Sequence, residues 1–296
     1  MNWTPDRRKG VLIGIGWFFL LVLIDGLLLW RIIGGQINGW TFIAALLVLV
    51  SLPAMVLLGY WLYGLVCLRY EFDRNRLIIY TAAGEQIVPM GNVVRVIDGR
   101  EAHLQVAMKS PVWPGYWIGP GVINDLGLTL FYAVTPPTEQ AIIVTPSVAY
   151  GISVPDMETF MQVFRAALHM GPSVEMTQTS RRASYLNWAV WHDRLLQSLV
   201  LGTVLINVLL FALLTFRYPA LPDCLPLHFD ARGVVDRIAA RQEVFDLPVI
   251  GLIVLTVNGL IGTALYRWQR IAAYLAWSGA LVVQVFFLLA LWNIIF

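Results

Sequence analysis

Five long stretches of the chain are almost free of charged residues. Each holds about 20 residues or more, which is the length of helix that crosses the apolar core of a bilayer at about 1.5 Å per residue. The pattern therefore predicts five transmembrane helices, at residues 11–30, 41–67, 195–216, 247–266 and 271–296. Basic residues precede the first stretch, but it is too long for a signal peptide and lacks a small-residue cleavage site, so we interpret it as a retained helix.

The composition supports a membrane protein. Hydrophobic residues make up 58% of the 296 residues and charged residues only 13%, and the mean hydropathy is +0.71. Soluble domains carry about 25% charged residues, so the composition excludes a soluble enzyme and a disordered protein. The net charge of +2 is too small for the basic surface that a nucleic acid requires, and we expect no nucleic-acid partner.

Lys and Arg near the helix ends predict the orientation, because cytoplasmic loops of membrane proteins are enriched in them. With the N-terminus inside, 11 such residues fall on the cytoplasmic side and 5 on the outer side. We therefore expect a cytoplasmic N-terminus and an outer C-terminus. The chain then divides into two helices (1–67), a cytoplasmic domain (68–170), a linker with interfacial aromatic residues (171–194), and three helices (195–296) with an outer loop at 217–246.

The segment between the second and third helices has the pattern of a small domain rich in β-strands. Short β-branched or aromatic runs alternate with Asp, Gly and Pro breaks, at residues 77–81, 93–97, 104–108, 128–134, 141–144 and 148–153. Asp156 can cap a helix that follows them. The apolar positions of that helix form one stripe, at Met157, Phe160, Met161, Phe164 and Leu168. Small strands followed by one amphipathic helix are in the order of a pleckstrin-homology barrel.

Several motifs in this segment resemble the bacterial pleckstrin-homology domains of membrane proteins. They are Tyr70-Glu71-Phe72-Asp73 with Leu77-Ile78-Ile79, Trp113-Pro114-Gly115-Tyr116-Trp117, Leu130-Phe131-Tyr132-Ala133, and Val144-Thr145-Pro146 with the Pro155-Asp156 helix start. The resemblance covers residues 68–170 and implies a small β-barrel capped by a C-terminal helix, in a protein of the bacterial cytoplasmic membrane. That family has no single established chemistry, so the resemblance implies a fold rather than a reaction.

Charge and aromatic residues indicate what the domain binds. Residues 69–170 hold seven basic and nine acidic side chains, and this net charge of −2 is unfavourable for binding phosphoinositides. Three arginines gather near the membrane, and we interpret them as charges that set the topology: Arg69, Arg74 and Arg76. Three aromatic residues form either a binding surface or a packed part of the domain: Trp113, Tyr116 and Trp117. Besides the lipid bilayer, we therefore expect a protein partner.

Asp25 is the one Asp, Glu, Lys, Arg or His inside the five stretches. A charge in lipid costs about 2.5 to 3.5 kcal/mol even on a permissive scale, so we expect Asp25 to face other helices. Its possible partners are one amide on each of the last three helices: Asn207, Asn258 and Gln284. These four polar residues form either a proton or substrate path or structural hydrogen bonds between helices.

The outer loop holds nine charged residues among 30. Leu221-Pro222, Leu225-Pro226-Leu227-His228-Phe229, Gly233, Asp236, Arg241 and Pro248 are similar to the uncharacterised domain of SdpI-like immunity and signal-transduction membrane proteins. That family commonly has Lys where this chain has Arg241. The resemblance implies a segment that lies between two membrane helices and continues into the second.

We expect an irregular outer loop, with hydrogen bonds that order it or a surface that recognises a partner. The recognition residues would be His228, Asp230, Arg232, Gly233, Asp236 and Arg241. A metal site at the histidine and the two nearby aspartates is a further alternative, although the additional nitrogen or sulfur ligands that zinc requires are missing from the sequence.

The sequence contains no nucleophile elbow, zinc-protease motif, phosphate loop or dinucleotide fingerprint. We therefore predict that the protein is not an enzyme and binds no cofactor and no metal. The expected function is that of a sensor, scaffold or immunity component, which links the outer loop to the cytoplasmic domain and an unknown protein partner. Two alternatives stay open, a small transporter or proton-coupled carrier that uses Asp25, and an accessory subunit of a larger membrane complex. A homo-oligomer also stays open.

Overall fold

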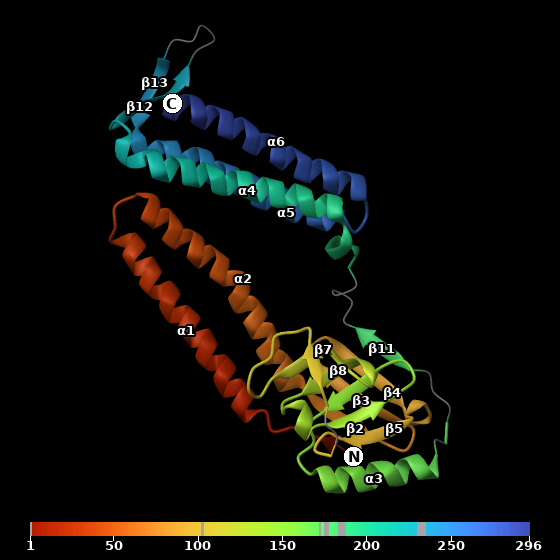
Figure 1. The fold of residues 1–296 in the computed structure, drawn as a ribbon. Coiled ribbons are helices and arrows are strands. Elements are labelled where there is room, and N and C mark those ends of the chain that lie inside the picture. The colour runs from red at the N-terminus through yellow and green to blue at the C-terminus, as the bar shows by residue number, and fades with distance from the viewer. Residues whose placement is uncertain (1, 102–103, 172, 175–177, 183–187, 230–234) are drawn as a thin grey trace. The chain divides into compact units, whose positions relative to one another are not determined.

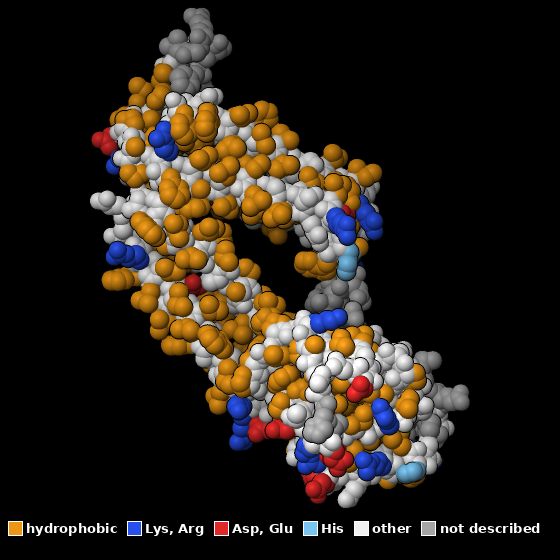
Figure 2. Space-filling view, viewed as in Figure 1, with side chains coloured by type: hydrophobic (Ala, Val, Ile, Leu, Met, Phe, Trp, Pro, Cys, Tyr) orange, Lys and Arg blue, Asp and Glu red, His pale blue; other side chains and the backbone are white. Residues whose placement is uncertain are grey.

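The computed structural model describes residues 2–101, 104–171, 173–174, 178–182, 188–229 and 235–296. Five of its helices are long and apolar enough to cross a membrane, which confirms the five predicted stretches. They are α1 (Arg8–Ile33), α2 (Gly39–Cys67), α4 (Arg194–Arg217), α5 (Asp246–Leu265) and α6 (Arg270–Ile295) (Figure 1). Figure 2 shows hydrophobic side chains spread over these helices. The chain thus has the character of a multi-pass membrane protein.

The chain folds as two compact units. One consists of Met1–Leu23 and Leu52–Leu186, and the other of Ile24–Ser51 and Asn187–Phe296. The first unit therefore holds the domain together with the beginning of α1 and the end of α2. The second holds the end of α1, the beginning of α2, and helices α4 to α6.

Two β-sheets form the domain. The first has the order β1-β2-β3-β4-β11, and the second has the order β5-β9-β10-β8-β7-β6. The strands of the first sheet are β1 (Asn2–Trp3), β2 (Arg69–Phe72), β3 (Arg76–Thr81), β4 (Gly84–Pro89) and β11 (Thr179–Arg182). Those of the second are β5 (Arg95–Asp98), β6 (Val106–Met108), β7 (Trp117–Ile123), β8 (Gly127–Ala133), β9 (Ala141–Val144) and β10 (Ala149–Ile152).

The described residues do not form the closed barrel that we expected. Each sheet ends in edge strands instead of joining back on itself, β1 and β11 in the first sheet and β5 and β6 in the second. Strand β10 also lies between β9 and β8, and pairs with β8 in parallel. Strand spacing along the chain does not reveal such a return, so the sequence could not distinguish two sheets from one closed sheet.

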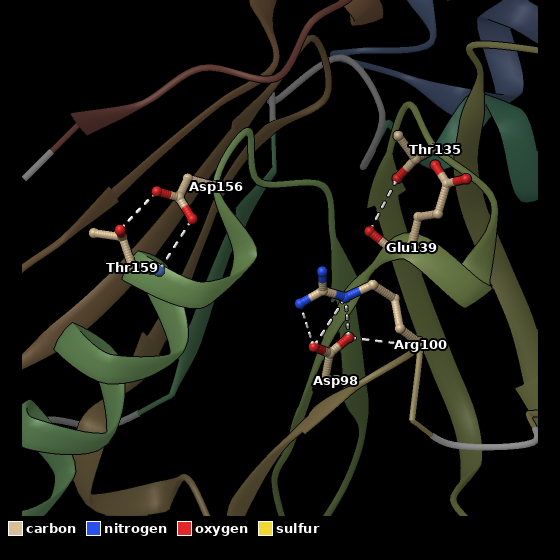
Figure 3. A network of polar contacts seen from close by, with 6 residues as sticks. All are labelled: Asp98, Arg100, Thr135, Glu139, Asp156 and Thr159. Atoms are coloured by element: carbon tan, nitrogen blue, oxygen red, sulfur yellow. Dashed lines mark hydrogen bonds and ion pairs between the residues drawn. The ribbon is translucent and has the colours of Figure 1, made fainter.

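Helix α3 (Met157–Met170) completes the core of the domain. Its predicted cap is confirmed, because the Asp156 Oδ1 atom accepts a hydrogen bond from the Thr159 backbone N–H at 3.1 Å (Figure 3). The predicted apolar stripe is buried at Met157, Phe160, Met161 and Phe164, and Leu168 is partly buried. The rings of Phe72 and Phe164 lie 5.5 Å apart between their centroids. Side chains of both sheets and of α3 thus share one buried cluster.

Small residues bring helices α5 and α6 together. Ala273 and Ala280 of α6 are fully buried, and the ring of Trp277 lies over Gly262 of α5. A Cβ atom at Gly262 would come within 2.8 Å of that ring. Small residues let helix backbones approach closely, which is how membrane helices associate in the absence of a hydrophobic driving force.

Between α4 and α5 the chain forms a β-hairpin, so the expected irregular loop is wrong. Strand β12 (Cys224–Phe229) pairs antiparallel with β13 (Val235–Ala240), and the register shifts around His228. Leu225 and Ala239 lie opposite each other and are buried, with Leu225 in the cluster that also contains Leu210 and Leu291. Burial of this cross-strand pair stabilises the hairpin. Pro226 and the many charged residues hid the strand pattern in the sequence.

Candidate functional site

Two amide side chains form a buried polar cluster among the last three helices. The Asn207 Nδ2 atom of α4 donates to Gln284 Oε1 of α6 at 3.2 Å and to the backbone oxygen of Pro248 at 3.1 Å. Gln284 Nε2 donates in turn to the backbone oxygen of Gly251 at 2.7 Å. Asn207 is 4% exposed and Gln284 is fully buried. We call Asn207, Gln284, Pro248 and Gly251 the amide cluster.

The direction of these hydrogen bonds is fixed by the two backbone oxygens. A carbonyl oxygen can only accept, so the NH₂ groups of Asn207 and Gln284 must face Pro248 and Gly251. Gln284 Oε1 then receives the second hydrogen of Asn207. Gly251 leaves the space for this arrangement, because a Cβ atom there would lie 2.8 Å from Gln284 Oε1 and 2.9 Å from Asn207 Nδ2.

A cavity of about 430 Å³ adjoins the amide cluster. Its walls are mostly apolar and come from α2, α4 and α5, with Phe42, Phe211 and Leu252 among them, and Asn207 forms part of the lining. No described residue donates a hydrogen bond to Asn207 Oδ1. The cavity therefore suits a neutral, apolar molecule that carries an N–H or O–H group, and it offers no charge to an ion.

Asp25 lies outside the amide cluster. Its Oδ2 atom is 2.5 Å from the Ser51 Oγ atom of α2, and the side chain is 8% exposed. Ser51 therefore takes the place of the amides that we considered as partners. Asn258 is half-buried, and its side chain makes no hydrogen bond in the described part of the chain. The sequence signal that we missed is the short connection between α1 and α2. It places the two helices side by side, so a polar residue of α2 is the nearest candidate partner for Asp25.

A second carboxylate, which the sequence did not single out, joins the start of α4 to the end of α5 and the start of α6. Asp193 Oδ2 accepts hydrogen bonds from the hydroxyls of Tyr274 at 2.5 Å and Tyr266 at 2.8 Å. Its Oδ1 atom accepts from the Leu196 backbone N–H and so caps α4. The Tyr274 hydroxyl and then the Leu196 N–H hold the pKa of Asp193 below its ordinary value. Asp193 is therefore ionised, and its hydrogen bonds hold the ends of three helices together.

The hairpin holds part of the predicted recognition surface. His228 stands opposite Arg237 in the ladder, while Asp230, Arg232 and Gly233 lie outside the described residues, as do the side chains of His228 and Asp236. Arg241 stays at the hairpin base, where its Nε atom is 3.7 Å from Asp223 Oδ1 and its guanidinium carbon is 5.0 Å from the centroid of the Tyr218 ring. Among the described residues, no group of three His, Cys, Asp or Glu side chains could hold a metal ion.

The aromatic motif of the domain packs against the membrane helices within the first unit. The Trp113 and Tyr116 rings stack with centroids 3.9 Å apart, and the Trp61 ring of α2 lies 5.9 Å from that of Trp113. Trp113 Nε1 donates to the backbone oxygen of Gly10 in α1 at 3.3 Å. Tyr116 is 5% exposed, and burial raises the pKa of its hydroxyl. Trp117 is partly buried and begins β7. These aromatic side chains act as packing in the described structure.

The segment before α1 also contacts the domain and the end of α2. Strand β1 pairs with β2, and the Trp3 ring meets the Phe160 ring edge-on at 5.8 Å between centroids. The Arg7 guanidinium donates to the backbone oxygens of Val66 and Leu65 at the end of α2, where helix carbonyls lack partners within the helix. We call β1, Arg7 and the contact of Trp113 and Gly115 with Gly10 the clamp.

Four of the seven basic residues of the domain make contacts within the chain. Arg100 makes a bidentate contact with Asp98, with Nη2 2.7 Å from Oδ2 and Nε 3.1 Å from Oδ1 (Figure 3). The hydrogen bonds from Arg100 hold the pKa of Asp98 below its usual range. Arg74 donates to the backbone oxygens of Met170 and Gly171 at the end of α3. Arg69 lies over the Tyr80 ring, and Arg76 pairs with Asp73.

Residues 68–167 match the family model of the bacterial PH domain. The inserted domain is thus similar to bacterial PH domains. Residues 205–252 match a domain of unknown function, DUF1648, which is found in SdpI-like proteins. Both resemblances expected from the sequence are confirmed. The chain matches no curated protein and no solved structure.

The two matches include part of the polar and aromatic features described above. The DUF1648 match contains the hairpin and three members of the amide cluster, Asn207, Pro248 and Gly251, while Gln284 lies beyond it. The PH match contains Trp113 to Tyr116, while the Gly10 and Trp61 surfaces that receive them lie outside it. Each matched segment is therefore completed by residues from elsewhere in the chain.

Proposed function

We propose that this chain is a non-enzymatic protein of the bacterial cytoplasmic membrane that acts as a sensor, scaffold or immunity-type component. In this proposal the hairpin faces outward and the amide cluster with its cavity receives an outer signal. The PH-like domain faces the cytoplasm and presents the response to a protein partner.

The clamp is the observation that carries the proposal. Leu65 of α2 belongs to the same buried cluster as Tyr70 and Phe160 of the domain, and Trp3, Val11 and other residues pack around them. A domain that was only tethered to the membrane would not need a shared core. Because helix ends and domain share one core, a displacement of α1 or α2 must repack the domain, which is what signal transmission requires.

The charges support a protein partner over an anionic lipid surface. The domain has a net charge of −2 between residues 69 and 170. Arg69, Arg74, Arg76 and Arg100 already contact a ring, backbone oxygens or carboxylates of the domain. A phosphoinositide or anionic lipid would have to displace these contacts before it could gain phosphate hydrogen bonds from these four arginines.

The alternatives are a small transporter or proton-coupled carrier and an accessory subunit. A carrier that uses Asp25 requires a polar path through the helices. The contact between Ser51 and Asp25, and the separate bonds within the amide cluster, support a sensor or scaffold over such a carrier. An accessory subunit would bind its partners through the helices, without any need for the clamp.

The test is recovery of partners with the full chain in mild detergent, with the bound proteins identified by mass spectrometry. Gly10→Ala disturbs the clamp, because its Cβ atom would overlap the backbone of Gly115, whereas Gly16→Ala on the same helix meets nothing within 4 Å. We expect the wild type and Gly16→Ala to retain the same protein and Gly10→Ala to lose it. Equal retention by all three would favour the accessory subunit. Solute or proton flux through reconstituted vesicles would favour the carrier.

A further inference from the structure

Asp25 has no positively charged partner in the described part of the chain. Its side chain is 8% exposed, and no Lys, Arg or His of the described chain makes a hydrogen bond or ion pair with it. The basic residues of α1 are Arg8 and Lys9 at one end and Arg31 near the other, and α2 has no charged residue. An ionised carboxylate here would be a charge in an apolar span without a counter-ion, which is unfavourable.

Ser51 makes two close contacts with its single hydroxyl. Its Oγ atom lies 2.5 Å from Asp25 Oδ2 and 2.7 Å from the backbone oxygen of Val48. A hydroxyl group carries one hydrogen, and a backbone oxygen and an ionised carboxylate can only accept. If Asp25 were ionised, both short contacts would have to share the one hydrogen of the Ser51 hydroxyl.

A proton on Asp25 satisfies both contacts. The carboxylic acid donates to Ser51 Oγ, and the Ser51 hydroxyl donates to the Val48 oxygen, so each contact has its own hydrogen. We propose that Asp25 is a proton-binding site inside the membrane, occupied at neutral pH, and that the neutral acid is the hydrogen-bond donor that joins α1 to α2. The proton comes from water and returns to it. Apolar protein sites are known to keep a carboxylic acid neutral so that it can donate.

The proton on Asp25 and the contact between α1 and α2 are therefore coupled. Removing the proton leaves one hydrogen between three oxygen atoms and adds an uncompensated charge to the span. Either change favours a wider separation of Asp25 from Ser51 or an approach of water. Proton binding at Asp25 requires neither the protein partner nor the proposed function.

Infrared spectroscopy of the full chain in ether-linked lipid bilayers tests the site, because these lipids have no ester carbonyl of their own. We expect a carboxylic-acid C=O stretch at neutral pH that is absent in Asp25→Asn. In Ser51→Ala the band should persist but shift, since the acid loses its acceptor. Ser198→Ala is the matched control: Ser198 Oγ donates to the Leu195 backbone oxygen at 2.8 Å as Ser51 does to Val48, but contacts no acid. It should leave the band in place.

Absence of the band from the wild type at neutral pH would overturn the proposal, as would a band that survives Asp25→Asn. A band at the same frequency in Ser51→Ala would show that the acid donates elsewhere. If Asp25→Asn fails to insert into the membrane, the pH dependence of the carboxylic-acid band in the wild type tests the proposal by itself. The band must already be present at neutral pH, before exposed carboxylates take up protons on acidification.

Discussion

The backbone of Gly10 in α1 lies directly against the backbone of Gly115 in the domain. A Cβ atom on either residue would overlap the other backbone, and Gly115 also has a φ of +90°, which favours glycine. The two glycines thus allow a close approach between α1 and the domain.

Gly10→Ala should destabilise the unit that contains the domain by about 1–3 kcal/mol, because the added methyl group must push the Gly115 backbone away. Thermal unfolding in detergent, followed by protease sensitivity of the domain, measures the effect. Gly16→Ala should unfold at or slightly above the wild-type temperature, since alanine favours a helix and meets nothing there. Equal unfolding temperatures for the two variants would mean that the contact contributes nothing.

The amide cluster should contribute as a pair. Asn207→Leu and Gln284→Leu each remove the hydrogen bond between the helices and should each cost about 0.6–2 kcal/mol. The double variant should cost less than the sum of the two, because the same bond is lost in both. Reversible unfolding in detergent measures the cycle. Asn258→Leu is the control and should be close to neutral, and strict additivity would contradict direct pairing.

Asp193 should make the stability of helices α4 to α6 depend on acidity. Its pKa is lowered in the folded protein, chiefly by the Tyr274 hydroxyl, so the unfolded chain takes up a proton more readily. The contribution is fully present above the ordinary value of 3.8 and is lost as the pH falls below it. Asp193→Asn keeps an oxygen that can cap α4 but cannot titrate. The loss of stability on acidification should therefore be smaller in this variant, and an unchanged slope would remove Asp193 from the linkage.

The expected orientation can be tested with cysteines. Cys224 is exposed on the hairpin and should react with an impermeant maleimide in cells whose outer membrane has been permeabilised. In a chain that lacks both native cysteines, Ser147→Cys on the domain should react only after the inner membrane is permeabilised. Labelling of position 147 from outside would reverse the proposed orientation.

The features that depend on local sequence could be predicted. The five spans follow from hydropathy, and the α3 stripe with its Asp156 cap follows from helical spacing. Strands β4 and β7 were missed because Gly84–Pro89 shows no alternation and Trp117–Ile123 contains two glycines and a proline. These strands are held by their neighbours in the sheet rather than by their own propensity.

The polar contacts could not be predicted from the sequence, because they join distant residues whose helices must first be placed. Ser51 is 26 positions from Asp25, and Tyr274 is 81 positions from Asp193. A serine or tyrosine in an apolar span is common and gives no sign of the acid that it meets. Asn207 and Gln284 were recognised as polar residues inside the membrane, but their pairing depends on the space at Gly251.

The two ends of the first sheet have a consequence for anyone who expresses the domain alone. Both edge strands, β1 and β11, lie outside residues 68–167, the first in the segment that leads into α1 and the second after α3. A fragment cut at the family boundaries would leave β2 and β4 with unpaired backbone groups and would remove Trp3 from the core. Such bare edges recruit strands from neighbouring molecules. The fragment should therefore aggregate, and a soluble version would need both flanking strands joined to it by new linkers.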